Sequence, residues 1–406
     1  MACQDIQLEY LEALFKRHQR DNGVYRVLWI KKAPAVPDGE NYLSTVSRIT
    51  IGVVLGSGKK RTLSVIVKTP LEKEGATYQW SMESGIFIGE IKIYTNLLHK
   101  MSELMYEFDD KRESLWPKLV GHESKMIIFE DLKQFGFKVT DRTLCHDIEH
   151  SKLVVRSLAR FHAMSKILLK RRFISSGDVQ RYALLVNVDF VDKLFGNGLK
   201  ILTREMKTWG DEWADIRTRI LKFSDTVGEK LEALNNSSED NFNVINHGDC
   251  WVCNLMFKYD PYENIPIDLR FVDFQFVHYQ SYGWDLTYYL YTSLLGDLRR
   301  KHYNDLLTAY HKSLSDTLLL YKYPEHEIPS LDDVHKEMER LKLFAMGICT
   351  LTHAIMTMPV KNAYNMNEAM KPDTNINYGY NLEIFRGRYK DEIGPDLRRF
   401  AEMGIY

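Results

Sequence analysis

The sequence predicts an α+β fold, with a β-sheet near the N-terminus and helices through most of the remaining chain. Apolar and polar residues alternate over residues 46–53, and a second strand pattern follows at 62–68 after a Gly-Ser-Gly-Lys-Lys turn, which is typical of a β-hairpin. From about residue 141 onward, apolar residues recur at helical spacing, for example over residues 153–169. These two patterns predict a sheet lobe followed by a helical lobe.

The other elements of the sheet lobe follow from local patterns. Apolar residues share one face over residues 4–20, and residues 87–94 repeat the i, i+4, i+7 spacing, so both segments are expected to be helices. Further strands are expected at residues 24–32, 115–120 and 126–130.

The boundary between the lobes is expected near residue 132, where the last strand pattern has ended. The sheet lobe then covers residues 1–132, and the helical lobe covers residues 133–406. A chain of 406 residues is long enough for two such units.

Charge and composition exclude several classes of protein. The chain has 54 basic and 55 acidic residues and a net charge of −1, so no global basic field favours nucleic acid or an anionic membrane. It lacks a run of about 18 apolar residues, which predicts no membrane span. Five cysteines without a pattern indicate a reducing compartment, and the N-terminal segment does not resemble a secretory signal. We expect a cytoplasmic protein, and the sequence leaves its oligomeric state open.

The stretch from Val244 to Asp285 carries the strongest chemical signal. It contains His247-Gly248-Asp249, Asn254 five residues after the Asp, an apolar hairpin over residues 255–272, and then Asp273-Phe274-Gln275. Phosphoryl transfer needs a carboxylate that orients the attacking hydroxyl and oxygen ligands that hold Mg²⁺ on the nucleotide phosphates. The interpretation is that Asp249 is the catalytic base, while Asn254 and Asp273 are the metal ligands.

The spacing of these residues is physically consistent with that interpretation. One loop carries both Asp249 and Asn254, and the hairpin would bring Asp273 back beside Asn254. Protein kinases have a similar order of His-Arg-Asp, Asn and Asp-Phe-Gly. Here Gly248 and Gln275 replace two of those residues, and no Ala-Pro-Glu motif follows, so protein kinase activity is disfavoured.

Lys68 and Glu90 are candidates for the nucleotide side of the site. A lysine at the end of a strand after a hairpin can reach the α- and β-phosphates, and it needs an acidic partner to hold it. Lys68 ends the strand pattern at 62–68, and Glu90 lies within the expected helix at 87–94. An isolated Lys–Glu pair is more often a solvated surface pair, but this order before His247 favours a functional pair.

Two further segments are candidates for nucleotide contacts. The polar turn before the first hairpin strand could hold phosphates through its backbone and through Asn41 and Ser44, or it could be an ordinary entry to the hairpin. Glu130, the last residue of the last expected strand, ends the sheet together with Asp131 and Leu132, and backbone groups there could bind an adenine, although Asp131 could be only a turn residue.

Other residues allow two interpretations. Asp285 could cap a helix or turn inward to hold the catalytic loop. His162 is more simply explained as a packing residue than as a catalytic one. A zinc or redox role for Cys250 and Cys253 is disfavoured, because no second pair of ligands accompanies them. The aromatic run after Gln275 could form the wall of an acceptor site or pack in the core.

Taken together, these segments resemble the ecdysteroid kinase-like (CHK kinase-like) family, which is similar to choline kinases and aminoglycoside phosphotransferases. The resemblance covers about residues 5–404. It is carried by GENYxS at Gly39–Ser44, VxVK ending at Lys68, FxxExxxY at Phe87–Tyr94, FEDL at Phe129–Leu132, LAxFHA at Leu158–Ala163, HGDxWxxNxMF at His247–Phe257, VDFQ at Val272–Gln275 and DLxYxL at Asp285–Leu290.

The resemblance implies a protein-kinase-like two-lobed fold, in which residues 1–132 bind the nucleotide and residues 133–406 carry catalysis and acceptor binding. It implies an ATP- and Mg²⁺-dependent kinase that phosphorylates a hydroxyl of a small molecule, such as an ecdysteroid-like or xenobiotic acceptor, with a link to detoxification. It also implies that Lys68 contacts ATP phosphates, that Glu90 orients Lys68, and that Glu130–Leu132 form the adenine hinge. The alternative from another class is a non-catalytic protein whose kinase-like cleft binds a nucleotide or a lipophilic ligand.

Overall fold

A computed structural model describes most of the chain. The described residues are 8–18, 23–36, 43–71, 75–179, 191–235, 241–369 and 377–406.

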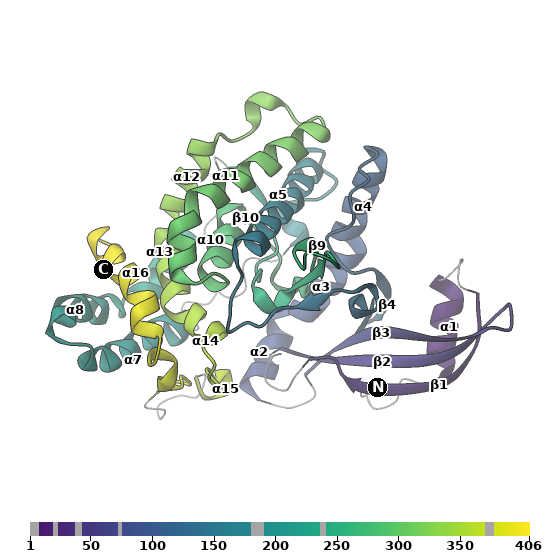
Figure 1. Cartoon of the computed structure of the whole chain (residues 1–406), viewed down its shortest axis with the longest axis horizontal. Coiled ribbons are helices and arrows are strands. Elements are labelled where there is room, and N and C mark those ends of the chain that lie inside the picture. Colours follow the sequence, from purple (N-terminus) through teal and green to yellow (C-terminus); the bar gives the residue numbers. More distant parts are fainter. Residues whose placement is uncertain are drawn as a thin grey trace.

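The N-terminal part is built on a five-stranded antiparallel sheet with the strand order β1-β2-β3-β5-β4 (Figure 1). Its strands are β1 (Val24–Pro34), β2 (Ser44–Leu55), β3 (Lys60–Pro70), β4 (Leu119–Glu123) and β5 (Met126–Glu130). The predicted hairpin is confirmed, because β2 pairs with β3 along its length.

The period of two along β3 divides the sheet into two faces. Val65 and Val67 are buried against the helix α1 (Leu8–His18), whose Leu11 and Phe15 belong to the same apolar cluster. Ile66 and Lys68 alternate with these valines and line a cavity on the opposite face. The first helix therefore covers one face of the sheet, and the other face is left for the site.

Helices make up most of the chain after residue 140, and they form the larger body beside the sheet in Figure 1. The helices between β3 and β4 are α2 (Ala76–Ser84), α3 (Ile86–Lys92) and α4 (Leu98–Glu107). The later helices are α5 (Ile148–Lys170), α7 (Asn197–Glu205), α8 (Ala214–Phe223), α9 (Val227–Leu234), α10 (Gly283–Thr292), α11 (Gly296–Leu320), α12 (Leu331–Arg340), α13 (Lys342–Gly347), α14 (His353–Thr357), α15 (Met366–Ala369) and α16 (Tyr389–Glu402). The predicted α+β class is confirmed.

Two small sheets lie within the helical part. One pairs β7 (Asn243–Asn246) with β10 (His278–Ser281), and the other has the order β6-β8-β9, from β6 (Lys138–Val139), β8 (Leu255–Tyr259) and β9 (Pro266–Phe271). The second sheet contains the predicted hairpin over residues 255–272. Both sheets place their connecting loops at the same site, as described below.

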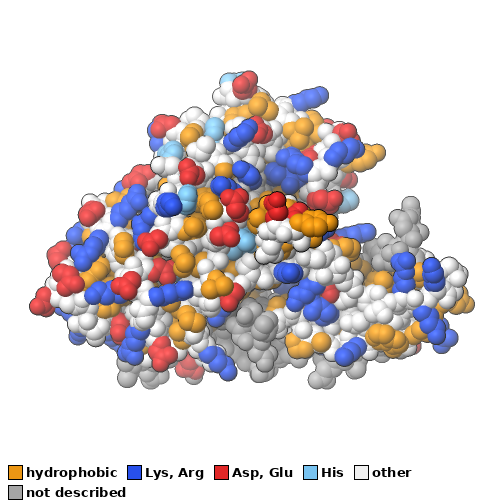
Figure 2. Space-filling model, in the orientation of Figure 1, with side chains coloured by type: hydrophobic (Ala, Val, Ile, Leu, Met, Phe, Trp, Pro, Cys, Tyr) orange, Lys and Arg blue, Asp and Glu red, His pale blue; other side chains and the backbone are white. Residues whose placement is uncertain are grey.

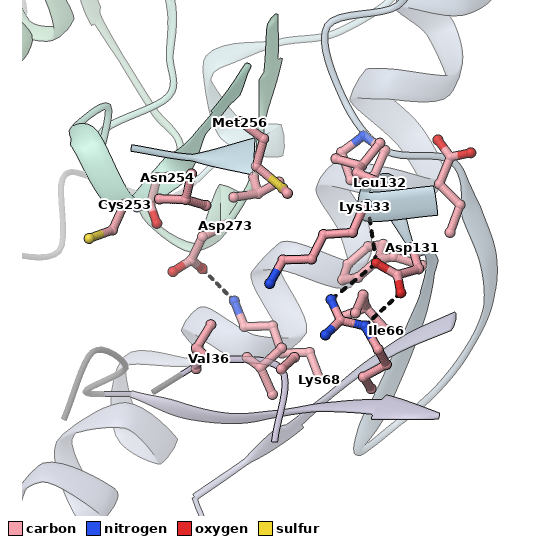
Figure 3. Close-up of a pocket in the computed structure, with 18 of the residues that line it drawn as sticks. Val36, Ile66, Lys68, Asp131, Leu132, Lys133, Cys253, Asn254, Met256 and Asp273 are labelled. Carbon is pink, nitrogen blue, oxygen red and sulfur yellow. Dashed lines mark hydrogen bonds and ion pairs between the residues drawn. The ribbon is translucent and has the colours of Figure 1, made fainter. Parts of the chain in front are cut away.

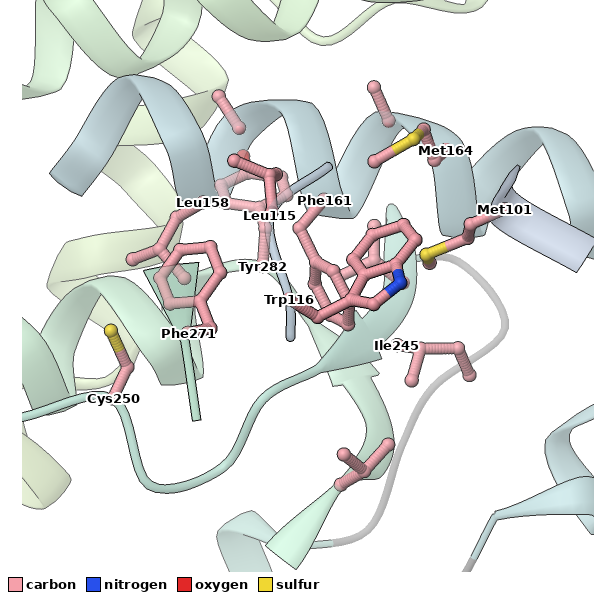
Figure 4. Packing of buried hydrophobic residues seen from close by; sticks show 14 of the residues in the cluster. Met101, Leu115, Trp116, Leu158, Phe161, Met164, Ile245, Cys250, Phe271 and Tyr282 are labelled. Atoms are coloured by element: carbon pink, nitrogen blue, oxygen red, sulfur yellow. The ribbon is translucent and has the colours of Figure 1, made fainter. Parts of the chain in front are cut away.

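The strands that precede these loops are packed in a buried apolar core. Leu158, Phe161 and Met164 of α5 belong to one fully buried cluster with Ile245 of β7 and Phe271 of β9 (Figure 4). Burial of an aliphatic or aromatic side chain of this size contributes roughly 1.5–3 kcal/mol. The loops that follow β7 and β9 therefore begin from rigid, well-packed strands.

Some predicted elements differ from the structure. The strand expected at residues 115–120 begins only at Leu119, because Pro117 cannot donate to a sheet ladder. The helix expected at residues 4–20 is confirmed over Leu8–His18, and its remaining residues lie outside the described part of the chain. The strands β7 and β10 have no counterpart among the predicted strands, because they are four residues long and carry polar residues.

The distribution of surface charge agrees with the composition. Figure 2 shows acidic and basic side chains interspersed over this face of the molecule, in keeping with the net charge of −1. In the described part of the chain, no helix combines the length and the apolar character that a membrane crossing would require.

A buried histidine next to α5 leads to a prediction about acid stability. The side chain of His146 contacts Thr140 Oγ1 at 2.9 Å through Nε2 and the Tyr289 hydroxyl at 3.0 Å through Nδ1. Burial, together with the neighbouring His150, lowers the pKa of His146 to about 3. The unfolded chain binds this proton near the ordinary histidine pKa of about 6.5.

We therefore expect the free energy of unfolding to fall as the pH drops below about 6.5, because the unfolded state then binds more protons than the folded state. His146 should account for a loss of about 1 kcal/mol between about pH 7.5 and 5.5. Urea unfolding at both pH values measures it. In His146→Gln this part of the pH dependence should disappear, and an unchanged dependence would contradict the assignment.

Candidate active site

The loop between β7 and β8 carries His247, Asp249 and Asn254, and its path depends on a glycine. Gly248 has φ +83°, and a Cβ atom there would lie 2.1 Å from the backbone oxygen of Phe276. An L-residue is disfavoured at this position both by the backbone angle and by the close approach. The glycine of the His-Gly-Asp sequence therefore lets the loop pass close to the segment that follows Asp273.

Asp285 holds the same loop from the helix α10. Its carboxylate accepts hydrogen bonds from His247 N at 2.6 Å and Gly248 N at 2.8 Å, and it lies 3.0 Å from His162 Nε2. His162 in turn contacts the Tyr310 hydroxyl at 2.8 Å. Of the two interpretations of Asp285, the structure supports the inward one, because Tyr282 occupies the cap position of α10. His162 is buried and both of its ring nitrogens have partners, which agrees with the simpler interpretation as a packing residue.

The environment of Asp285 keeps its carboxylate charged. Burial is the largest influence and would raise the pKa, but the hydrogen bond and charge of His162, with the charges of His247 and His278, outweigh it and lower the pKa. A buried charge of this kind is maintained only when it is fully paired.

Asp249 is buried, and donors hold both of its carboxylate oxygens. Asn254 Nδ2 donates to Oδ2 at 2.8 Å and to the Asp249 backbone oxygen at 2.9 Å. The Tyr288 hydroxyl donates to Oδ1 at 2.8 Å. Burial and then the nearby charge of Asp273 raise the pKa of Asp249 to about 7, despite both hydrogen bonds. A carboxylate with a pKa near neutrality is suited to take a proton from an alcohol.

The β8–β9 hairpin returns Asp273 to the loop, as the sequence predicts. Leu255 pairs with Phe271, and Val272 N donates to the Asn254 backbone oxygen at 3.0 Å. Asp273 itself has φ +67°, an unfavourable angle for a residue with a side chain. Its backbone is thus turned at the point where its carboxylate enters the cavity.

Lys68 joins Asp273 to the sheet lobe. Its ammonium donates to Glu90 Oε2 at 2.6 Å and also to Asp273 Oδ1. Burial alone would lower the pKa of Lys68, but the charges of Asp273 and Glu90 outweigh it and hold the pKa above its ordinary value. Both Lys68 and Glu90 are buried, so this is not the solvated surface pair considered as the alternative.

The segment after β5 is anchored to the sheet through Asp131. Its carboxylate accepts from Arg48 Nε at 2.6 Å, Arg48 Nη2 at 3.2 Å and Ser64 Oγ at 2.7 Å. It also accepts from Lys133 N at 3.2 Å and so caps the short 3₁₀ turn Leu132–Phe135. Asp131 is therefore more than a turn residue, because it fixes the expected hinge to β2 and β3.

One cavity of about 410 Å³ brings these parts together (Figure 3). Its lining includes residues from the sheet, from the segment after β5 and from both loops of the helical part. The predicted site residues on its wall are Lys68, Glu90, Glu130, Leu132, Asn254 and Asp273. Figure 3 shows Lys68 and Asp273 joined across the cavity, with Asn254 beside Asp273.

Three predicted residues lie elsewhere. Asp249 is connected to the cavity wall through its hydrogen bond with Asn254. Ser44 begins β2 opposite Pro70 and is buried outside the set of residues that line the cavity. Asn41 lies outside the described residues. The expected phosphate contacts of Asn41 and Ser44 therefore stay predictions.

The model of the ecdysteroid kinase-like family matches residues 38–323, well over half of the chain. The chain belongs to the ecdysteroid kinase-like family. The match includes His247, Asp249, Asn254 and Asp273, and the resemblance seen in the sequence is confirmed. Membership of this family, with the sheet and helical parts facing one cavity, agrees with the protein-kinase-like two-lobed fold that the resemblance implies.

Among solved structures, the one described as the streptomycin-ATP-APH(2")-IIa ternary complex is similar to this family member at 13% identity. The similarity covers 85% of this chain and 99% of that chain, with a TM-score of 0.31. A TM-score this low supports no conclusion, so the fold follows from the elements described above. No curated protein matches the chain significantly.

Sequence reasoning missed two contacts of this family member's site. The sequence places Tyr288 only in an aromatic run, and Arg48 in a strand without a role. The signal for Tyr288 is its position three residues after Asp285, since residues i and i+3 share a helix face. The pairing of Arg48 with Asp131 depends on the packing of β2 beside the segment after β5, which no local pattern reveals.

The disfavoured zinc site finds no support. Among the described residues, no group of three or more His, Cys, Asp or Glu side chains could hold a metal ion. Cys250 is buried, and burial raises the pKa of its thiol well above the ordinary value. Asn254 and Asp273 supply one amide and one carboxylate, and their role as metal ligands stays a prediction.

Proposed function

We propose that the protein is an ATP- and Mg²⁺-dependent phosphotransferase that acts on a hydroxyl group of a small molecule. The observation that carries the proposal is the chain of contacts from Glu90 through Lys68 to Asp273 on one cavity, with Asp249 held beside Asn254. Phosphoryl transfer requires this combination of a fixed cation, metal ligands and a carboxylate base.

We infer that the parts of Mg·ATP would contact different residues of the cavity wall. Ile66, Phe129 and Leu132 form an apolar wall that suits a nucleotide base, and Lys68 would contact the phosphates. The Asn254 amide and the Asp273 carboxylate are oxygen ligands of the kind that Mg²⁺ accepts, and both line the same cavity. When bound there, Mg²⁺ would neutralise charge on the β- and γ-phosphates.

The reaction follows from the position of Asp249. Asp249 accepts the proton of the acceptor hydroxyl while the hydroxyl oxygen forms a bond to the γ-phosphorus. The bond from the γ-phosphorus to the bridging oxygen of ADP breaks, and ADP leaves. Lys68 stabilises the phosphate charge during transfer. The pKa of Asp249, about 7, allows it to take up this proton near neutral pH.

The division of labour between the lobes belongs to the same proposal. Residues 1–132 would bind the nucleotide, and residues 133–406 would supply Asp249 and the acceptor site. The family name supports an ecdysteroid-like acceptor, and a hydroxylated xenobiotic is the other acceptor class we propose. The aromatic residues after Gln275 pack in the apolar core clusters, which is the second of the two interpretations of this run, so the proposed acceptor class rests on the family name and not on them.

ADP release in the presence of Mg·ATP tests this proposal. The acceptors are ecdysteroids, glycosides, phenols and choline, and mass spectrometry identifies the phosphorylated product. We expect acceptor-dependent ADP release that stops when EDTA removes Mg²⁺. Binding of Mg·ATP without turnover of any acceptor would contradict this acceptor range, and failure to bind Mg·ATP would favour a non-catalytic protein that holds a lipophilic ligand.

A further inference from the structure

The carboxylate of Asp249 is held by two donors of different origin. Asn254, which lies on the same loop, donates to Oδ2 at 2.8 Å. Tyr288, which lies on α10, donates to Oδ1 at 2.8 Å. Donors on both oxygens restrict the rotation of the carboxylate plane, which sets the direction of the lone pairs that remain for a substrate.

The helix α10 fixes both the backbone and the side chain of the loop. Asp285 accepts from the backbone N–H groups of His247 and Gly248, and Tyr288 follows one turn later on the same helix face. The helix α10 thereby fixes both the position of the loop and the orientation of the Asp249 carboxylate. Such support is what holds a catalytic group within the narrow limits that chemistry requires.

Packing alone does not account for the Tyr288 hydroxyl. The ring belongs to an apolar cluster with Trp251 and Trp284, a role that a phenylalanine would also fill. The hydroxyl adds the contact to Asp249, and Met356 Sδ lies 4.0 Å away. A buried hydroxyl costs free energy unless it is hydrogen-bonded, and its charged partner here is the candidate base.

We propose that Tyr288 is a positioning residue of the phosphotransfer, whose hydroxyl orients the Asp249 carboxylate toward the acceptor hydroxyl. The inference rests on the proposed function, because it assigns Asp249 the role of base. Tyr288 itself neither receives the proton nor contacts the phosphates. It determines how often the carboxylate points in the productive direction, which affects kcat rather than nucleotide binding.

The neighbouring residue provides a matched control. Tyr289 lies on the same helix and is equally buried, but its hydroxyl contacts His146 at 3.0 Å and Ser151 at 3.3 Å. Tyr288→Phe and Tyr289→Phe therefore remove the same atom from adjacent positions of one helix. Only the first removes a donor from Asp249.

The test compares kcat and KM of the wild type and both variants with Mg·ATP. The probe is the ecdysteroid, glycoside, phenol or choline acceptor that the wild type turns over fastest. Loss of a hydrogen bond to a charged group costs enough to lower kcat roughly ten- to a hundredfold in Tyr288→Phe. The KM for ATP should stay within about twofold, and Tyr289→Phe should keep its kcat within about threefold of the wild type.

A double-mutant cycle separates positioning from a general structural effect. In an Asp249→Asn background, Tyr288→Phe should have almost no further effect on kcat, because the group that it orients is already inactive. Equal loss of kcat in Tyr288→Phe and Tyr289→Phe, or an undiminished loss in the Asp249→Asn background, would overturn the inference and leave the proposed function intact. A wild type without turnover of any acceptor would instead overturn the proposed function, and the inference with it.

Discussion

Asp249→Asn is expected to lower acceptor-dependent turnover by roughly 10²–10⁴, because loss of a general base has an effect of this size. The substitution keeps the shape of the side chain, and the Tyr288 hydroxyl can still donate to its oxygen, while the new NH₂ group faces the amide donor of Asn254. The amide cannot accept the proton of the acceptor hydroxyl near neutral pH. Steady-state ADP release with a hydroxylated acceptor measures the effect.

Nucleotide binding distinguishes this loss from a general defect. Among the described residues, Asp249 is not one of those that line the cavity, and it contacts the cavity wall through Asn254, so the Kd for Mg·ATP should change by less than about tenfold in Asp249→Asn. Asp297→Asn is the matched control, because that carboxylate is 99% exposed and pairs with Arg300 on the surface. Turnover by Asp249→Asn at the rate of the control variant would show that this carboxylate is not the base.

Asp285→Asn is expected to lower the free energy of unfolding by about 3 kcal/mol, the order of magnitude for breaking a buried ionic contact. The carboxylate accepts from His247 N, Gly248 N and His162, so an amide would place an NH₂ group against donors. We also expect turnover to fall, since the loop that carries Asp249 would lose its anchor. Urea unfolding and ADP release on the same preparation measure both effects.

The surface variant again provides the comparison. Asp297→Asn makes the same chemical change in the first turn of α11, where solvent screens the charge, and should cost less than about 1 kcal/mol. If Asp285→Asn were as stable as Asp297→Asn, the loop would not depend on the carboxylate. Loss of stability without loss of turnover would separate the support of the fold from the support of catalysis.

Much of the candidate site is readable from the sequence, because its contacts are set by short-range geometry. Asp249 and Asn254 share one loop, and a single hairpin returns Asp273 to them. The sequence also predicts the contact between Lys68 and Glu90, although Lys68 lies on the strand β3 and Glu90 on the helix α3. The order of motifs along the chain supplied that information, since no local pattern specifies such a pair.

Contacts that depend on tertiary packing were not readable in the same way. Arg48 lies in a segment with a strand pattern, which does not indicate its partner. It contacts Asp131 because β2 packs beside the segment after β5. The strands β7 and β10 pair across more than thirty residues through segments too short to show a period of two. The contact of Tyr288 with Asp249 also depends on tertiary packing. The sequence shows the helical spacing around Tyr288, but it does not show that Asp249 is its partner.

Binding of Mg·ATP measured by isothermal titration calorimetry tests the central claim most directly, because it does not require the acceptor to be known. We expect the wild type and Asp297→Asn to bind with similar affinity, and Asp273→Asn to bind roughly tenfold or more weakly, because it loses a charged metal ligand. Absence of Mg·ATP binding by the wild type, or unchanged affinity in Asp273→Asn, would contradict a nucleotide site between Lys68 and Asp273.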